Sequence, residues 1–370
     1  MFWLLYYRVH ALSRRHLYAQ EKLLPGIFKR RLFLYFSDKI RYNRNIQPVN
    51  KYSKPTQGRI AMFIYKEIDM EKRYLCIDVG GGSIKYAVLD KQLTFYEKGS
   101  VPTPYEDVPF YLEVLEKLYR KFEDQVCGIA MSVPGIIDSD NGICITGGAL
   151  KYVELLPLAN LMKERCGVPV SIMNDAKCAA LAEATWGSLA GCQDAIVLVF
   201  GTGIGGAIVK DGEIHMGKHF AAGEFSFILM DQECDIEDNI WARRNGSHRL
   251  IRLASLAKGM KPEDITGVDV FRWAEEGDAA ALWALDKFTR DIAYVIMNLQ
   301  IIYDPERFAI GGGISKQPLL LEYILKNLHY YYSIYPCPIP HAEVTTCKYY
   351  NDSNLIGALG YYLSRFGLKE

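Results

Sequence analysis

The sequence predicts an α/β protein built from two related units with a cleft between them. Two observations support this prediction. Strands and helices alternate from Arg73 onward, and one arrangement of strand, glycine turn and strand occurs twice. At 370 residues the chain is long enough for two domains. Because 50% of its residues are hydrophobic and 23% are charged, disordered and fibrous classes are excluded.

The first hairpin joins residues 74–79 to residues 83–89 through three glycines, Gly80, Gly81 and Gly82. Both flanking runs favour β-structure, so a strand follows the turn rather than a helix. Glycines lack the Cβ that would keep a ligand away from backbone N–H groups, and such turns bind phosphates. Asp78, at the end of the first strand, can hold Mg²⁺ or its waters near those phosphates. The alternative is an ordinary glycine hairpin with a capping aspartate.

The second hairpin repeats this arrangement. Residues 195–200 and 207–210 form the strands, and the turn contains Gly201, Thr202, Gly203 and Gly205. This turn matches G-x-G-x-x-G, but a dinucleotide-binding fold requires a helix after the third glycine, whereas a strand follows here. A protein kinase is excluded too, because its β3 lysine, His-Arg-Asp and Asp-Phe-Gly motifs do not follow. Two phosphate-type hairpins therefore indicate two related halves.

The other elements follow in α/β order. Apolar spacing predicts helices over residues 107–122, 155–166, 175–186, 279–302, 319–328 and 354–366. Strands are predicted over residues 93–101, 126–133, 168–173 and 308–310. We expect residues 70–178 with 352–370 to form a smaller α/β domain, and residues 179–351 to form a larger one.

Three further places carry candidate ligand-binding residues. Asn174 and Asp175 lie where a buried strand meets an alanine-rich helix. Since strand carboxyl ends face the ligand crevice of an α/β protein, Asp175 can accept a hydroxyl proton there; the alternative is a helix cap. Glu224 offers a second carboxylate, or is a solvated loop acid. A third bare backbone surface, suited to adenine or phosphate, is formed by Gly311, Gly312 and Gly313.

Residues 1–69 differ from the rest of the chain. They carry 14 Lys and Arg against 4 Asp and Glu, and they mix basic with aromatic residues. No apolar run is long enough to span a membrane, and the first residues do not form a secretory signal. Such a segment can lie on an anionic membrane or contact nucleic acid. We favour a basic extension outside the working protein, which would then begin at Met70.

The nine cysteines show no C-x-x-C spacing. They are therefore interpreted as reduced thiols of a cytosolic protein without a metal cluster. The expected location is cytoplasmic.

Taken together, the motifs resemble those of the ROK family (repressor, open reading frame, kinase), which contains sugar kinases and regulators. The resembling motifs lie at residues 78–85, 132–135, 174–176, 201–206, 222–224 and 304–313. The resemblance implies a two-domain actin-like ATPase fold, related to ribonuclease H, in which each domain is a mixed sheet flanked by helices. A cleft between the domains would hold the ligands.

The resemblance also implies roles for single residues. Asp175 would be the catalytic base, Asn174 and Glu224 would hold sugar hydroxyls, and Gly135 and Gly148 would line the sugar pocket. ATP and Mg²⁺ are the expected cofactors, with Mg²⁺ held by Asp78 through water. The expected nucleotide-binding residues are Asp78, Gly80, Gly81, Gly82, Ser83, Lys85, Gly201, Thr202, Gly203, Gly205, Gly311, Gly312 and Gly313. A homodimer is expected as well.

The sequence departs from the family pattern after Glu224. Most ROK kinases continue with Ile-Gly-His, whose His binds the sugar and a structural zinc, and they contain a C-x-C-G-x-x-G-C cluster. Here Phe227 occupies the His position and Cys234 stands alone. Because zinc needs about four ligands, no zinc is predicted. Phe227 would present an apolar face that favours β-glucosides; alternatively, it points into the core.

The sequence thus predicts ATP-dependent phosphorylation of a sugar hydroxyl, with a hexose, an amino sugar or a β-glucoside as substrate. One rival is a sugar-responsive transcriptional regulator, but residues 1–69 show no pair of alanine-rich helices joined by a glycine turn. The other rival is a catalytically silent sugar sensor. Neither nucleic acid nor a membrane is an expected partner.

Overall fold

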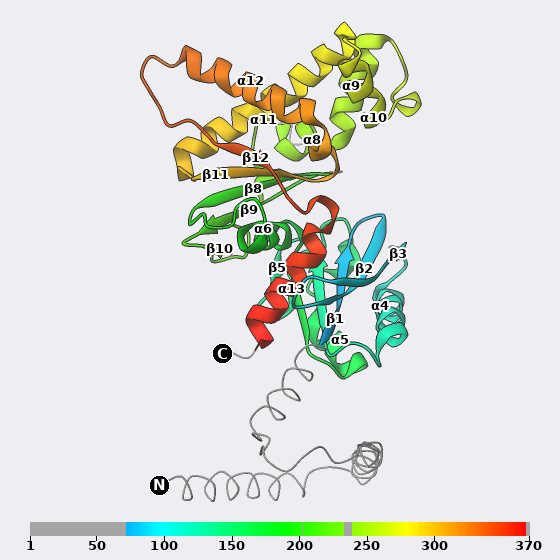
Figure 1. Cartoon of the computed structure of the whole chain (residues 1–370). Helices are drawn as coiled ribbons and strands as arrows, with labels where there is room; N and C mark the ends of the chain where they lie inside the picture. The colour runs from blue at the N-terminus through cyan, green and yellow to red at the C-terminus, as the bar shows by residue number, and fades with distance from the viewer. Residues whose placement is uncertain (1–71, 202, 233–238, 368–370) are drawn as a thin grey trace, which may run out of the picture. The chain divides into compact units, whose positions relative to one another are not determined.

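The computed structural model describes residues 72–201, 203–232 and 239–367 (Figure 1). The predicted basic extension 1–69, Thr202 and Cys234 lie outside these described residues. Within the described part, no helix combines the length and the apolar character that a membrane crossing requires.

The first sheet has five strands in the order β3-β2-β1-β4-β7. Its strands are β1 (Arg73–Val79), β2 (Ser83–Asp90), β3 (Phe95–Pro102), β4 (Ile129–Val133) and β7 (Val170–Asn174). Strands β1, β2 and β3 pair antiparallel, whereas β1, β4 and β7 pair parallel. The sheet is therefore mixed, and the first predicted hairpin is confirmed.

Helices cover both faces of this sheet. They are α4 (Val108–Phe122), α5 (Leu158–Cys166) and α13 (Ser353–Phe366). Successive strand residues point to opposite faces. Accordingly Leu75 and Ile77 pack with α4 and α5, whereas Tyr74 and Cys76 pack with α13. A small hairpin, β5 (Ile137–Asp138) with β6 (Ile143–Cys144), and the 3₁₀ turn η2 (Lys151–Val153) follow β4.

The second sheet repeats the pattern in the order β10-β9-β8-β11-β12. Its strands are β8 (Ala195–Phe200), β9 (Ile204–Lys210), β10 (Glu213–Ile214), β11 (Arg307–Gly311) and β12 (Val344–Thr346). Strands β8, β9 and β10 pair antiparallel, and β8, β11 and β12 pair parallel. The second predicted hairpin is confirmed, as is the similarity of the two halves.

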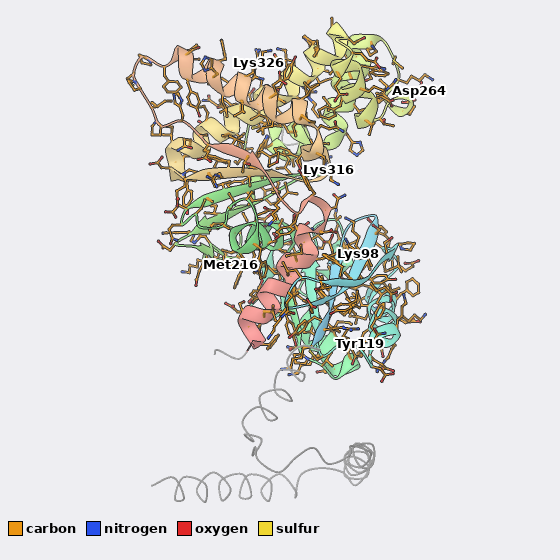
Figure 2. All side chains as sticks on the ribbon, in the orientation of Figure 1. Lys98, Tyr119, Met216, Asp264, Lys316 and Lys326 are labelled. Atoms are coloured by element: carbon orange, nitrogen blue, oxygen red, sulfur yellow. The ribbon has the colours of Figure 1, made fainter. Side chains whose placement is uncertain are left out.

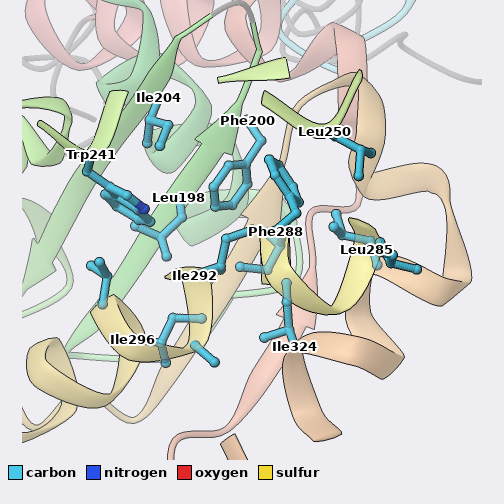
Figure 3. Packing of buried hydrophobic residues seen from close by; sticks show 14 of the residues in the cluster. Leu198, Phe200, Ile204, Trp241, Leu250, Leu285, Phe288, Ile292, Ile296 and Ile324 are labelled. Carbon is cyan, nitrogen blue, oxygen red and sulfur yellow. The ribbon is translucent and has the colours of Figure 1, made fainter. Parts of the chain in front are cut away.

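The helices of the second half are α8 (Trp241–Asn245), α9 (Ser247–Lys258), α10 (Gly267–Glu275), α11 (Ala279–Tyr303) and α12 (Pro318–Ile334). Their apolar faces close one core on β8 (Figure 3). In it the rings of Phe200 and Trp241 meet edge to face at 5.9 Å, and the Trp241 Nε1 donates to Asn245 Oδ1 at 2.9 Å. Burying both rings with the indole N–H paired makes this core a stable support for the second turn.

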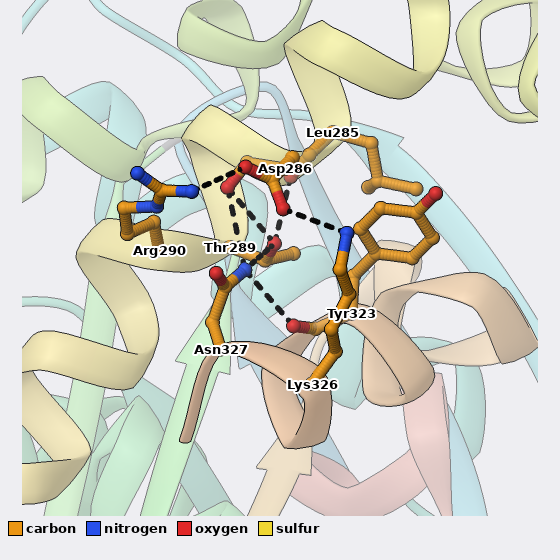
Figure 4. A network of polar contacts seen from close by, with 7 residues as sticks. All are labelled: Leu285, Asp286, Thr289, Arg290, Tyr323, Lys326 and Asn327. Carbon is orange, nitrogen blue, oxygen red and sulfur yellow. Dashed lines mark hydrogen bonds and ion pairs between the residues drawn. The ribbon is translucent and has the colours of Figure 1, made fainter. Parts of the chain in front are cut away.

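Helices α11 and α12 are joined by polar contacts as well (Figure 4). The Asn327 Nδ2 donates to Thr289 Oγ1 at 3.0 Å, and Lys326 Nζ lies 3.1 Å from Asp286 Oδ1. Lys326, also labelled in Figure 2, is largely exposed, so the buried Asn327 contact is the stronger constraint. The remaining 3₁₀ turns are η3 (Phe225–Phe227), η4 (Pro262–Asp264), η5 (Gly313–Lys316) and η6 (Tyr350–Asp352).

Several predicted boundaries are wrong. The helix expected over residues 319–328 continues to Ile334, and two other boundaries differ for local reasons. The strand expected over residues 126–133 begins at Ile129, because the Val126 N–H still bonds to Phe122 O at the end of α4. The helix expected over residues 155–166 begins at Leu158, because Leu155 has a φ of 57°, which an α-helix excludes.

Helix α6 (Asp175–Trp186) has the predicted bounds and packs against α13, β8 and β9. It runs unbroken through the predicted domain boundary at residue 178, so no secondary-structure break marks that position. The division into two domains at residues 178 and 352 stays a prediction.

Candidate active site

Residues that follow strands β1, β4, β7 and β8 line one cavity of about 730 Å³. This volume lies within the range of cavities that hold small molecules. The cavity brings together most predicted site residues: Gly80, Gly81, Gly82, Gly135, Gly148, Asn174, Asp175, Gly201, Gly203, Gly205 and Glu224. The carboxyl ends of strands from both sheets therefore meet at one place, as an α/β ligand crevice requires.

Asn174, not Asp175, caps helix α6. The Asn174 Oδ1 accepts from the Lys177 N–H at 3.0 Å, and its Nδ2 donates to Gly135 O at 2.9 Å. Both ends of the amide are thus engaged with protein, and the amide fixes the turn after β4 to the start of α6. The alternative interpretation of Asp175 as the helix cap is wrong.

Asp175 is half-buried and lines the cavity. Burial, together with the Asp78 and Glu224 carboxylates, raises the pKa of its carboxyl from 3.8 to about 7. The Ala176 N–H, which donates to Asp175 Oδ1 at 2.8 Å, and the Lys177 ammonium oppose this rise in pKa. A carboxylate with a pKa near neutrality is suited to accept a proton in catalysis.

The turns after β4 and β6 need glycine. Gly135 has a φ of 94° and Gly148 a φ of 58°, in the left-handed region that favours glycine. A Cβ on Gly135 would lie 2.2 Å from Thr146 O, and one on Gly148 would lie 3.1 Å from Gly135 N. Side chains at these positions would push the two turns apart and change the shape of the cavity wall.

Glu224 lines the same cavity and contacts a lysine that sequence reasoning missed. Burial raises the pKa of the Glu224 carboxyl, and the Lys177 ammonium opposes this effect. Lys177 Nζ lies 3.4 Å from Glu224 Oε1, and the Lys177 side chain is completely buried. The available signal was a lone cation in an otherwise small and apolar stretch of α6.

Phe227 lines the cavity with 64% of its surface exposed. Phe225 is the buried member of the pair, at 7%, and it packs against β9 at Gly206. The alternative that placed Phe227 in the core is therefore wrong. Tyr105, which was not predicted, also lines the cavity, and its hydroxyl donates to Gly81 O. The cavity thus carries two exposed aromatic rings.

Asp78 is buried beside the first glycine turn, outside the set of cavity-lining residues. Its Oδ1 accepts from Ser132 Oγ and from Asn354 Nδ2, each at 2.9 Å. Lys85 Nζ lies 3.8 Å from its Oδ2. These partners come from β4, α13 and β2, so the carboxylate has one fixed orientation. Asn354 was missed because it is far from Asp78 in the sequence.

A smaller cavity of about 180 Å³ adjoins the first and shares Val199 and Asn354 with it. Its lining includes the predicted residues Lys85, Gly311, Gly312 and Gly313. A Cβ on Gly313 would meet nothing within 4 Å, whereas one on Gly312 would lie 2.1 Å from Phe200 O. Gly313 therefore leaves its backbone open to a ligand, and Gly312 is needed by the fold.

Asp78 and Ser83 are predicted nucleotide-binding residues that line neither cavity. The Ser83 carbonyl accepts the Gly80 N–H at 3.0 Å, which closes the turn. Thr202 lies outside the described residues. Among the residues described, no group of three or more His, Cys, Asp or Glu could hold a metal ion, and the cysteines seen there are free thiols.

The sequence and fold of this chain are similar to those of known proteins. The β-glucoside kinase of Listeria monocytogenes is 28% identical over 249 residues, which cover 67% of this chain and 83% of that protein. The glucokinase of Halalkalibacterium halodurans is 28% identical over 315 residues, covering 78% of this chain and 94% of that protein. A solved ROK family protein from Streptococcus pneumoniae, in complex with sucrose, superposes with a TM-score of 0.71 at 28% identity and covers 79% of this chain and 98% of that one.

The model of the ROK family matches residues 74–364, which include both hairpins and every described residue of the two cavities. The superposition confirms the actin-like ATPase fold that the resemblance implied. This chain belongs to the ROK family.

Proposed function

We propose that this protein transfers a phosphoryl group from ATP to a sugar hydroxyl, with Asp175 as the general base. Its enzyme class is that of the carbohydrate kinases, since its relatives are named β-glucoside kinase, glucokinase and N-acetyl-D-glucosamine kinase. One observation carries the assignment of the base. Asp175 has a pKa of about 7, leaves the capping of α6 to Asn174, and lines a cavity bordered by two glycine turns.

The chemistry follows from this placement. A sugar hydroxyl within hydrogen-bond reach of Asp175 would give up its proton to the carboxylate as it attacks the terminal phosphate. Glu224, which lines the same cavity, would accept a hydrogen bond from another hydroxyl and so orient the ring. The turn at Gly135 and Gly148 would form the wall against which the sugar lies.

The nucleotide would lie along the glycine turns. A Cβ on Gly82 or on Gly203 would meet nothing within 4 Å, so the backbone there is accessible to phosphate oxygens. Asp78 would hold Mg²⁺ through water, and its contacts with Ser132 and Asn354 leave lone pairs for that purpose. When bound, Mg²⁺ neutralises charge on the phosphates. The absence of zinc stays a prediction.

We further propose that β-glucosides are accepted at least as well as free glucose, with the 6-hydroxyl as the attacking group. Phe227 and Tyr105 offer apolar faces at the cavity, where an aglycone or a second sugar ring can pack. Two similar proteins support this class: one is named β-glucoside kinase, and one was solved with a disaccharide, sucrose. We also propose that the protein forms a homodimer and is located in the cytoplasm.

The test is ADP release by the full-length protein with glucose, N-acetylmannosamine and an aryl β-glucoside. We expect kcat/KM for the β-glucoside to equal or exceed that for glucose, and Phe227→Ala to lower it by about 3–30-fold for the β-glucoside alone. A strong preference for a free monosaccharide would contradict the substrate proposal. Sugar binding without ADP release would indicate a silent sensor, and salt-sensitive DNA binding would indicate a regulator.

A further inference from the structure

Lys177 is a charged residue in a place that an apolar side chain could fill. Its side chain has no exposed surface, although it stands on α6 among small apolar residues. Taking an ammonium out of water is unfavourable, and only close partners compensate for this cost. A methionine would occupy a similar volume without that cost, so the partners of Lys177 indicate what the charge does.

Both partners belong to one irregular segment, residues 215–227. Lys177 Nζ donates to Phe220 O at 3.0 Å and lies 3.4 Å from Glu224 Oε1. The segment starts near Met216, labelled in Figure 2, and ends at Phe227. It therefore carries both Glu224 and Phe227, the residues proposed to contact the sugar.

Local backbone hydrogen bonds and contacts with other elements hold this segment. Its backbone takes left-handed φ angles of 70° at Gly217, 58° at Phe220 and 81° at Gly223, so no regular ladder holds it in place. At one end Phe225 is buried in the core against β9. In the middle of the segment, the Lys177 ammonium donates to the carbonyl of Phe220.

The anchor is attached to the helix that carries the base. Lys177 stands two residues after Asp175, and Asn174 caps its backbone N–H. The charged groups that act on Asp175 are Asp78 from β1, Glu224 from the segment and Lys177 itself. Lys85 from β2 lies 3.8 Å from Asp78. The Lys177 ammonium thus opposes the carboxylates that raise the pKa of Asp175, and it joins the helix of the base to Glu224.

We propose that Lys177 is a positioning residue for the sugar: its ammonium holds Glu224 and residues 215–227 in a fixed arrangement relative to Asp175. The inference rests on the proposed function, because Asp175 and Glu224 have their roles there. Without the ammonium, the segment loses its contact at Phe220 and Glu224 loses its counter-charge. Sugar binding should then weaken more than turnover. In addition, Asp175 should bind its proton more tightly, since the opposing positive charge is gone.

The experiment compares full-length Lys177→Met, Lys177→Gln and Lys177→Arg with the parent, using the best sugar of the panel. A matched control is Lys258→Met, which removes a lysine that pairs with Asp278 at 2.5 Å, away from both cavities. For Lys177→Met we expect KM for the sugar to rise about 10–100-fold and kcat to fall less than about 10-fold. The acid limb of kcat/KM should move up by about one pH unit. Lys177→Arg keeps the positive charge, so both changes should be smaller than in Lys177→Met. Lys258→Met should show neither change.

A parental KM and an unchanged pH profile in Lys177→Met would overturn the proposal, even if the melting temperature fell, because the role would then be packing alone. If Lys177→Met does not fold, Lys177→Gln replaces it: it can still donate to Phe220 O but lacks the charge, and a parental KM there overturns the proposal. A parent that phosphorylates no sugar overturns the proposed function and this inference together. If the parent is active and Lys177→Met has the same KM and pH profile as the parent, only this inference is overturned.

Discussion

The two glycine hairpins share one strand pattern but are held by different interactions. In each, an antiparallel pair is extended on one side by a parallel strand, β4 in the first sheet and β11 in the second. Two residues before the first glycine, the first hairpin has Asp78, held by polar partners from β4 and α13. The second hairpin has Val199 at this position, and the next residue, Phe200, is buried against Trp241. Before the first turn, polar contacts of the Asp78 carboxylate fix the chain. Before the second turn, the apolar packing of Phe200 does so.

Their glycines differ in a related way. The turns themselves are alike, since a Cβ on Gly82 or Gly203 would meet nothing within 4 Å. The strand after the second turn differs, because its glycines have no room for a side chain. A Cβ on Gly205 would lie 2.9 Å from Ala176 Cβ, and one on Gly206 would lie 2.3 Å from Phe225 Cδ2. In the same glycine pattern, some glycines therefore leave space for a ligand, and others allow a neighbouring element to pack closely. Only the surroundings distinguish the two uses.

The largest expected effect comes from removing the charge of Asp175, which lies between the two hairpins. Asp175→Asn keeps the shape of the side chain but cannot accept a proton, so kcat should fall by about 10²–10⁴-fold. Because Asn174 provides the cap of α6, the folded structure should be retained. Steady-state ADP release and a circular dichroism spectrum check both statements. Parental turnover would show that Asp175 is not the base.

The same substitution should stabilise the protein in a pH-dependent manner. The pKa of Asp175 is raised from 3.8 to about 7 in the folded protein, so folding favours the protonated form. Its contribution to stability is complete below the unfolded pKa and is lost as pH rises through about 7; this loss amounts to at most about 4 kcal/mol. Without ligands, Asp175→Asn should therefore melt at a higher temperature than the parent at alkaline pH. The gap should narrow at acidic pH, and a gap independent of pH would contradict this prediction.

A smaller effect distinguishes the two uses of glycine. Gly206→Ala should lower the free energy of unfolding by about 1–3 kcal/mol, because the new methyl group collides with the buried Phe225 ring. Gly82→Ala adds the same methyl group where nothing lies within 4 Å, so stability should change by less than about 0.5 kcal/mol while KM for ATP rises. Urea unfolding of the two variants measures the contrast. Equal losses of stability would show that both hairpins depend on packing.

Much of this architecture was predictable because its signals are local. Glycine turns between β-favouring runs determine the two hairpins, and the step from a buried strand to an alanine-rich helix gives the bounds of α6. Helix α8 was missed because it has only five residues and gains its stability from tertiary packing. Helices α9 and α10 were missed although both are amphipathic and α10 begins with a capping box formed by Thr266 and Asp269, so their signals were present in the sequence. Phe225 and Phe227 are both apolar and two positions apart in a 3₁₀ turn, so the sequence cannot tell which one enters the core.

The site residues missed from sequence act across long separations. Asn354 reaches Asp78 over 276 positions, and Lys177 reaches Phe220 over 43. No local pattern encodes such contacts, because the elements that carry the side chains are far apart in the sequence and meet only in the folded structure. Predicting them requires the fold first.

The contact between Asn354 and Asp78 has a consequence for biosynthesis. Helix α13 covers one face of the first sheet. Strands β1 and β2 are made first, so one apolar face of them stays without this cover until α13 has been made. During translation, residues 195–346 can assemble the second sheet while one face of β1 and β2 stays uncovered. The first sheet therefore gains the cover of α13, and Asp78 its hydrogen bond from Asn354, only after this helix has left the ribosome. A nascent chain stalled before α13 would expose the apolar face of β1 and β2 and would be a substrate for chaperones before it could be an enzyme.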